Sequence, residues 1–142
     1  MRTSELSRWT FATHDACATL FWWPGRLPLD DVYPGRLDEA RAEGKRLAQV
    51  ALLQGSGHNI IGLFVSIWRK LGALHIDRLY ILVDPSEESV RRWMRLGFKR
   101  LGWPERTWYL ADDKPVTAMV LDVSEATWTD AQLRRIEQPI QT

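Results

Sequence analysis

The hydrophobic pattern in the middle of the chain predicts a strand, a helix and a second strand. Residues 45–53 are apolar at almost every position except Gln49, as in a central strand that is covered on both faces. Apolar residues within 60–71 recur at the three- and four-residue spacing of one helical face. Residues 76–83 are again rich in β-branched and aromatic types. Because the glycine-containing loop 54–59 joins the first strand to the helix, the pattern predicts two adjoining parallel strands.

A second helix start follows this unit. Asp84 is expected as its N-cap, with Pro85 at the first helical position and Glu87 as the capping-box partner. The helix is expected to run to Leu96 and to end at Gly97. The other predicted elements are a hairpin over 7–23, a loop over 24–35, a helix over 36–43, strands over 98–101, 108–111 and 116–123, a turn over 112–115, and a helix over 130–138. This order indicates an α/β (α+β) fold with a mixed, twisted sheet of about six or seven strands and flanking helices.

Composition restricts the functional classes. The 142 residues suit one domain, which we divide into a partial hairpin at 1–15, a core at 16–123, and a C-terminal helix and tail at 124–142. The formal net charge of +1 argues against a nucleic-acid binder. The lone Cys17 leaves no internal disulfide, and the three histidines are too scattered for a metal site. With no apolar run of the roughly 20 residues that span a membrane and no signal-like N-terminus, a cytoplasmic protein is expected.

The loop 54–59 is the main candidate for ligand binding. Its backbone N–H groups, its glycines and the positive end of the following helix dipole favour an anion. The same two-glycine sequence also suits an ordinary turn from strand to helix, so both interpretations stay open. His58 is either a base beside this loop or a polar residue of the first helical turn. Asp84 is either a ligand contact at a strand end or only a helix cap, and the basic residues within 91–100 form either a solvated face or a surface for an acidic partner.

Eight tryptophans are more than a core of this size requires. Trp22 and Trp23 are adjacent in a predicted strand, so their side chains are expected on opposite faces of the sheet. One indole therefore belongs in the core, and the other needs a covering helix, a ligand or a partner.

Several motifs, taken in their order, resemble the GNAT superfamily of N-acyltransferases. The succession of strand, glycine loop, helix, strand, Asp84-Pro85, helix and Gly97-Phe98 is similar to the acyl-donor half of that fold. A narrower resemblance is to the N-acyl amino acid synthase branch, which is akin to the acyl-homoserine-lactone synthases. The motifs are ATL at 18–20, LPLDDVYP at 27–34, RLAQV at 46–50, VDP at 83–85 and LGF at 96–98.

This resemblance, which covers about residues 16–123, makes that segment the acyl-donor core. It implies transfer of an acyl group from a thioester on coenzyme A or acyl carrier protein to an amine, such as that of an amino acid. It implies no permanently bound cofactor, because the thioester is a co-substrate. The pantetheine would lie between the strands 45–53 and 76–83, with its phosphate over the glycine loop. The acyl-donor contacts so implied are Leu53, Gln54, Gly55, Ser56, Gly57, His58, Asn59 and Asp84.

Two family positions with catalytic roles are substituted. Gln49 stands where the branch has a glutamate, and Leu52 replaces an arginine three residues later. A carboxamide can donate or accept a hydrogen bond, but it cannot act as a base near neutral pH. Trp93 stands where many GNAT enzymes have the tyrosine that protonates the leaving thiolate. The chain is therefore expected to be an N-acyltransferase with an altered site, a degraded GNAT-like domain that binds an acyl carrier or another protein, or a structural module.

Family members have a first strand and two helices before the hairpin, which form much of the acceptor site, whereas Met1 falls almost at the hairpin here. Either another chain supplies that part or the acceptor site is missing. The hairpin would then leave one edge of the sheet unpaired, and a homodimer or a separate partner chain would cover it. We therefore expect one of these two assemblies.

Overall fold

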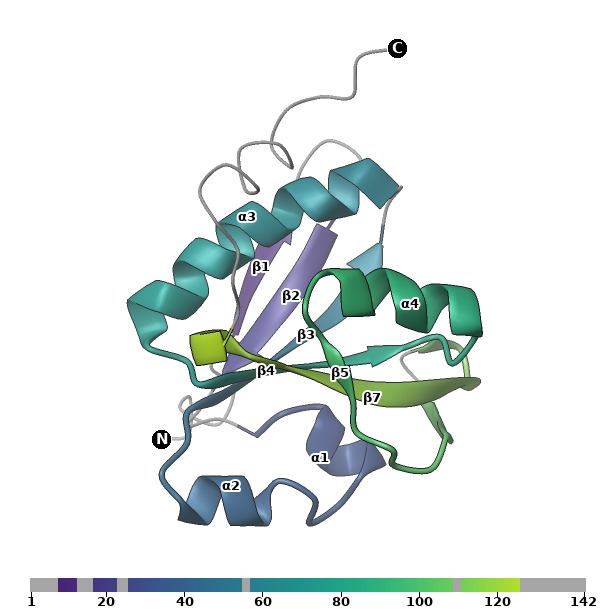
Figure 1. The fold of residues 1–142 in the computed structure, drawn as a ribbon, viewed down its shortest axis with the longest axis horizontal. Coiled ribbons are helices and arrows are strands. Elements are labelled where there is room, and N and C mark those ends of the chain that lie inside the picture. Colours follow the sequence, from purple (N-terminus) through teal and green to yellow (C-terminus); the bar gives the residue numbers. More distant parts are fainter. Residues whose placement is uncertain (1–7, 13–16, 23–25, 55–56, 109–110, 126–142) are drawn as a thin grey trace.

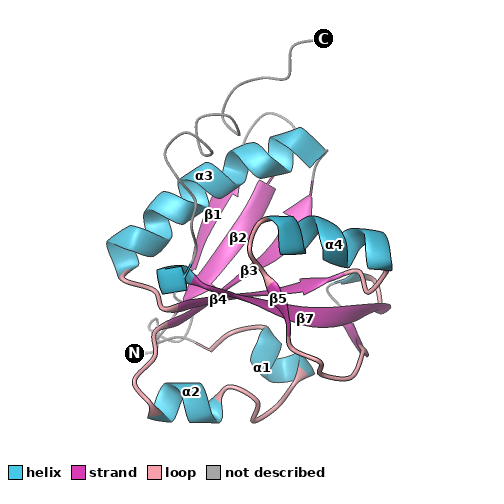
Figure 2. Ribbon diagram, in the orientation of Figure 1, coloured by secondary structure: helices cyan, strands magenta, loops and turns pink. Residues whose placement is uncertain are grey.

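The chain folds into a twisted sheet that lies between two layers of helices (Figure 1). The computed structural model describes residues 8–12, 17–22, 26–54, 57–108 and 111–125, and for 8–12, 52–54 and 57–65 it describes the backbone alone. Helices α3 (Gly57–Leu74) and α4 (Glu87–Arg95) cover one face of the sheet, which we call the upper face. Helices α1 (Leu29–Val32) and α2 (Asp38–Ala42) cover the lower face (Figure 2).

The described strands form a mixed sheet in the order β1-β2-β3-β4-β7-β5, with β6 paired beside β7. The expected fold class is thereby confirmed, and the predicted N-terminal hairpin is present as an antiparallel pair of β1 and β2. The helix expected over 130–138 lies outside the described residues. The bounds are β1 (Arg8–Ala12), β2 (Cys17–Trp22), β3 (Leu47–Gln54), β4 (Arg78–Val83), β5 (Lys99–Arg100), β6 (Arg106–Trp108) and β7 (Lys114–Asp122), followed by a 3-10 turn at Val123–Glu125.

The central strands β3 and β4 are parallel, as predicted, and they separate toward their carboxyl ends. Their pairing begins with Leu47 opposite Arg78 and ends with Val50 opposite Ile81. Beyond that point β3 continues beside β2, while β4 continues beside β7. Figure 1 shows the two strands diverging there, with α3 starting close to the end of β3. The sheet thus opens in its middle.

Strand β3 is buried on both faces, as its apolar sequence predicts. Ala48 and Val50 belong to the upper core with residues of α3 and α4. Leu47 and Ala51 belong to the lower core with residues of α1 and α2. Gln49 lies between them in sequence and is fully buried. Among the side chains of β3 that the structure describes, it is the one polar side chain.

Neighbouring side chains at the end of β2 lie on opposite faces of the sheet. Phe21 is part of the lower core. Trp22 is half-buried and packs against the upper core, with the Lys70 ammonium of α3 at 5.5 Å from the centroid of its ring. A helix therefore covers Trp22, whereas Trp23 lies outside the described residues.

The start of α4 differs from the sequence prediction. Ser86, not Asp84, is the N-cap, because the Ser86 hydroxyl accepts a hydrogen bond from the Ser89 N–H at 3.3 Å. The Asp84 carboxylate instead accepts hydrogen bonds from the Ser86 N–H at 3.2 Å and from its hydroxyl at 3.3 Å. The expected C-terminal end is confirmed, since Leu96 is the C-cap and Gly97 has a φ of +102°.

Two connecting segments also differ from expectation. The segment predicted as a loop over 24–35 contains α1, which is a single helical turn. Where a strand was predicted over 108–111, the described residues contain a strand at 106–108, and residues 109 and 110 lie outside the described ones. Asp112 and Asp113 adopt left-handed φ angles of 56° and 58°. The Asp113 N–H donates to the Trp108 carbonyl at 3.0 Å, so the chain reverses directly into β7.

An ion pair between the exposed Arg41 and the partly buried Asp30 holds the two lower helices together. The Arg41 guanidinium of α2 donates to both Asp30 oxygens, at 2.7 and 2.6 Å. The Leu27 N–H donates to the same carboxylate at 2.9 Å. Burial raises the pKa of the Asp30 carboxyl, but the hydrogen bonds from Arg41 and Leu27 outweigh that effect, so its pKa is lowered in the folded protein.

This ion pair predicts an acid-dependent loss of stability. We expect Asp30→Asn to lower the free energy of unfolding at neutral pH by about 1 kcal/mol, because hydrogen bonds to a charged group contribute about 1.5–3 kcal/mol and the exposure of Arg41 reduces this. In the wild-type protein the contribution is present above the unfolded-state pKa of about 4, and it is lost as the pH falls through the lower folded-state pKa. Urea denaturation at neutral and acidic pH should show a smaller acid effect in the variant. The exposed Glu39→Gln on α2 is the control, and an equal effect in both variants would show that the ion pair does not stabilise the lower layer.

Candidate functional site

The opening between β3 and β4 is the candidate functional site. Only two residues separate Gln54, at the end of β3, from Gly57, at the start of α3. The positive end of an 18-residue helix therefore lies at the carboxyl end of the central strands. In open sheets ligands commonly bind at this end of the strands.

A bulge in β3 contributes to the opening. Cys17 lies opposite Gln54 and Thr19 lies opposite Ala51, so three residue steps of β3 face two steps of β2. An extra residue of this kind bends the strand that carries it and increases its twist. It lies just beyond the last pair with β4, where a bend directs β3 away from β4.

The loop expected to contact the acyl donor is described only in part. Gln54 is the last residue of β3 and Gly57 the first residue of α3. Gly55 and Ser56 lie outside the described residues, as do the side chains of Leu53, His58 and Asn59. Their contact with a donor therefore stays a prediction. Asp84 is exposed just beyond the end of β4, and its proposed donor contact also stays a prediction.

Gln49 has a structural partner that the sequence does not reveal. Its Oε1 accepts a hydrogen bond from the Leu29 N–H at 2.7 Å. Leu29 is the first residue of α1, and the N-cap Pro28 has no side-chain acceptor for this turn. The Gln49 Nε2 is buried and has no hydrogen-bond partner in the part of the chain that the structure describes. Gln49 thus caps α1 from the middle of the sheet and keeps an amide donor free.

Trp93 lies on the opposite side of the sheet from Gln49. Its indole is half-buried against the upper core, where it meets the Phe98 ring edge-on at a centroid distance of 5.6 Å. Gln49 faces the lower layer through its bond to α1. The structure therefore does not bring these two predicted catalytic side chains together.

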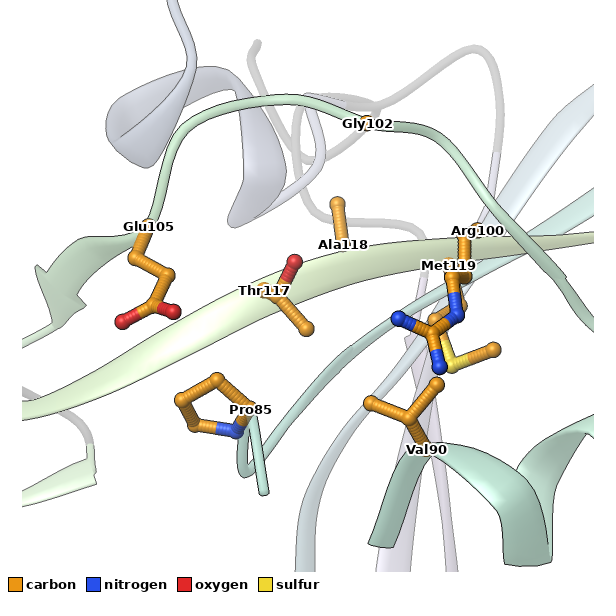
Figure 3. Close-up of a pocket in the computed structure, with 8 residues that line it drawn as sticks. All are labelled: Pro85, Val90, Arg100, Gly102, Glu105, Thr117, Ala118 and Met119. Carbon is orange, nitrogen blue, oxygen red and sulfur yellow. The ribbon is translucent and has the colours of Figure 1, made fainter. Parts of the chain in front are cut away.

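A small cavity lies beside the start of α4. Its volume is about 140 Å³, and the loop that carries Gly102 and Glu105 arches past β7 and contributes both residues to its lining (Figure 3). The Arg100 guanidinium on its wall is already paired with Glu87 at 2.8 Å. The lining residues are Pro85, Val90, Arg100, Gly102, Glu105, Thr117, Ala118 and Met119.

A larger cavity lies on the lower side of the sheet, between α1 and β6. Its volume is about 330 Å³, and its lining includes charged, polar and aromatic side chains. The sequence analysis did not indicate this site, because α1 and β6 are more than seventy residues apart and neither carries a recognisable motif. The lining residues are Asp31, Val32, Arg106, Thr107 and Trp108.

An aromatic cluster with two arginines adjoins this cavity. The rings of Tyr33 and Trp103 are 5.1 Å apart, with the Arg106 guanidinium 5.3 Å from the Tyr33 ring and the Arg36 guanidinium 5.4 Å from the Trp103 ring. Burial raises the pKa of the Tyr33 hydroxyl, although Arg106 and Arg36 oppose the rise. The hydroxyl donates to the Pro104 carbonyl at 2.6 Å, so Tyr33 serves as a neutral anchor.

The described residues offer no candidate for two further classes of site. They contain no group of three or more His, Cys, Asp or Glu side chains that could hold a metal ion. Within the same part of the chain, no helix has both the length and the apolar character needed to cross a membrane.

Comparisons with known proteins agree with this geometry. No family model and no curated protein matches the sequence. Among solved structures, FeeM, an N-acyl amino acid synthase from uncultured soil microbes, aligns with a TM-score of 0.74 at 25% identity, over 84% of this chain and 74% of that one. AAC(6')-Ib in complex with ribostamycin and coenzyme A aligns with a TM-score of 0.52 at 18% identity, over 89% and 71%. Both are GNAT-type N-acyltransferases, and the chain has their fold.

Proposed function

We propose that the chain is an N-acyltransferase that moves an acyl group from acyl-coenzyme A to an amine, with an amino acid as the acceptor. The observation that carries this proposal is the separation of β3 and β4 beyond Val50 and Ile81, at the start of α3. The likeness to FeeM supports the acceptor class. The AAC(6')-Ib structures, which contain coenzyme A or acetyl-coenzyme A, support the donor.

The opening suits an extended thioester arm. Past Val50, β3 has no strand partner on the side of β4 among the described residues, so its backbone groups on that side are available to a ligand. An extended chain with amide groups can hydrogen-bond to such an edge in the way that an added strand does. The donor's phosphate would then lie at the loop 54–59 and the first turn of α3, where helical N–H groups favour an anion.

The reaction itself needs a free amine and a stabilised oxyanion. The amine nitrogen attacks the thioester carbonyl carbon, the C–S bond breaks with its electron pair on sulfur, and the proton lost by nitrogen passes to the thiolate or to solvent. Backbone N–H groups of β3 at the opening are suitable donors to the carbonyl oxygen as it becomes negative. Neither the Gln49 carboxamide nor the Trp93 indole can transfer a proton near neutral pH. We therefore propose slow turnover of an amine that loses its proton to solvent.

The same substitutions favour a second candidate, a degraded domain that binds an acyl carrier or another protein without catalysis. Its expected docking surface, the basic run within 91–100, is mostly neutralised by its own carboxylates. Acyl-coenzyme A is therefore the donor we favour over acyl carrier protein. The ion pairs are Arg91–Glu87 at 3.3 Å, Arg92–Glu88 at 3.4 Å, Lys99–Glu125 at 2.8 Å and Arg100–Glu87 at 2.8 Å.

We also propose a homodimer or a complex with a second chain, located in the cytoplasm. Strand β1 is the outermost strand on its side of the described sheet. Such edges are usually covered, and a symmetric dimer is the commonest cover in oligomeric proteins.

Donor binding is the first test. We expect calorimetry to show heat on addition of acyl-coenzyme A and of coenzyme A, and weaker or no binding of acyl carrier protein. At 100 times the Kd, the donor should stabilise the fold by about 2.7 kcal/mol and raise Tm by several degrees. Adenosine diphosphate separates binding of the phosphate from binding of the thioester arm. Neither heat nor a thermal shift with any acyl-coenzyme A from two to sixteen carbons would contradict the proposal.

Restoring a base is the second test. We expect Gln49→Glu to raise the rate of amine acylation by about 10² to 10⁴, the usual effect of a positioned general base. The Leu29 N–H can donate to a carboxylate as it does to the carboxamide, so the side chain should keep its orientation. Burial should raise the pKa of the new carboxyl, so the gain in kcat should increase with pH.

The matched control is Gln49→Met. It removes the acceptor for the Leu29 N–H, which should cost about 1–3 kcal/mol of stability, and it supplies no base. The acylation rate should therefore not rise. A folded Gln49→Glu variant that is no faster than wild type would show that the reaction does not pass near this residue.

A further inference from the structure

The cavity between α1 and β6, which we call the α1/β6 cavity, lies close to the candidate active site. Its wall includes Asp31 and Val32 of α1, while Leu29, at the other end of the same helical turn, is hydrogen-bonded to Gln49. At 1.5 Å per residue, Leu29 and Val32 are separated by only about 4.5 Å along the helix. The cavity therefore begins about one helical turn along α1 from the residue bonded to Gln49, which stands where the resembled branch has a glutamate.

The cavity also lies at the correct end of the sheet. Its β6 wall pairs with β7 from Lys114 to Val116, and the next residue of β7, Thr117, pairs with Val83 at the end of β4. This is the end toward which β3 and β4 diverge. A ligand in the cavity would approach the opening from the lower face.

Arg106 gives the cavity an available positive charge. Among the described residues its guanidinium contacts neutral groups, the Val32 carbonyl at 3.4 Å and the Tyr33 ring at 5.3 Å. No carboxylate of the described residues forms an ion pair with it, although Asp31 and Glu105 are nearby, since Asp31 pairs with Arg26. A guanidinium held in this way keeps donors for a planar anion.

Trp108 supplies a second, unsatisfied donor. The residue is only 6% exposed and lines the cavity. Its indole Nε1 is buried and has no hydrogen-bond partner among the described residues. A buried polar group without a partner is uncommon and costly. A rotation of the indole toward the cavity would let an acceptor oxygen of a ligand satisfy it.

We propose that the α1/β6 cavity binds the carboxylate of the acceptor, with Arg106 as the ion-pair partner and the Trp108 indole as a hydrogen-bond donor. This inference rests on the proposed function and assigns a substrate-recognition site to it. Asp31 also lines the cavity, but its carboxylate is paired with Arg26. Because the acceptor in the proposed reaction is an amine, the expected ligand carries both a carboxylate and an amine, and an amine without a carboxylate binds poorly.

The test compares each of the twenty proteinogenic amino acids with its own primary amide. Without any acyl donor, the ¹⁵N–¹H resonance of the Trp108 indole, assigned with Trp108→Phe, should shift with at least one amino acid and not with its amide. In Arg106→Gln the Kd of that amino acid should rise about ten- to hundredfold, the usual loss for a hydrogen-bonded ion pair. Arg106→Lys, which keeps the charge but not the planar fork, should lose less.

Steady-state kinetics supply the second measurement. Arg106→Gln should raise KM for the amino acid and leave KM for its amide and for acyl-coenzyme A unchanged. Lys114→Gln is the matched control, because it removes an exposed cation from the same hairpin without lining the cavity. It should change none of these constants.

The two proposals fail in different ways. Acylation of amino acids and their amides with equal KM would overturn the carboxylate site and leave the N-acyltransferase intact. Binding of an amino acid at Trp108 without any acylation would support the site and contradict the enzyme. If no amino acid shifts the Trp108 resonance, or if Arg106→Gln leaves the Kd unchanged, the carboxylate site is wrong.

Discussion

The arrangement of the molecule depends on one hydrogen bond, from the Leu29 N–H of α1 to the Oε1 of Gln49 in β3. Gln49 is completely buried, and an uncharged amide can occupy such a position at a far lower desolvation cost than a carboxylate. The bond fixes the start of α1 against the sheet, and the Asp30–Arg41 pair then fixes α2 against α1. Of the contacts described above, this hydrogen bond is the one polar contact that joins either lower helix to the central strands.

The sheet divides the molecule into two chemical sides. The upper side carries the long helix α3, whose positive end suits a phosphate-bearing donor. The lower side carries arginines, aromatic rings and the larger cavity, which suit a small polar acceptor. In the proposed reaction the two substrates meet through the opening between β3 and β4. Gln49 and Trp93 lie on different sides of the sheet, so no common site is formed by their side chains in the structure.

The sequence predicted the features that depend on local pattern. The periodicity within 60–71 predicted α3, and the apolar runs predicted β3 and β4 as parallel neighbours. The sequence did not predict α1, because the first N–H of this helix donates to Gln49, which lies twenty residues away in the sequence. The sequence predicted Asp84 as the N-cap of α4, whereas Ser86 is the N-cap. Both side chains can accept a hydrogen bond at a helix start, and only the backbone conformation decides which one does so. The α1/β6 cavity could not be predicted, since it exists only where Val32 and Arg106 meet across 74 residues.

The short parallel contact between β3 and β4 also divides the protein along its sequence. One half of the sheet, β1 to β3, comes from residues before α3, and the other half, β4 to β7, comes from residues after it. Each half is internally antiparallel, and four residue pairs join them in the described part of the sheet. A break within the α3–β4 connection, near the exposed His75 with its left-handed φ of 57°, would leave the strand pairs within each half on one fragment but would divide both cores. The two fragments would therefore have to reassemble before either core could form.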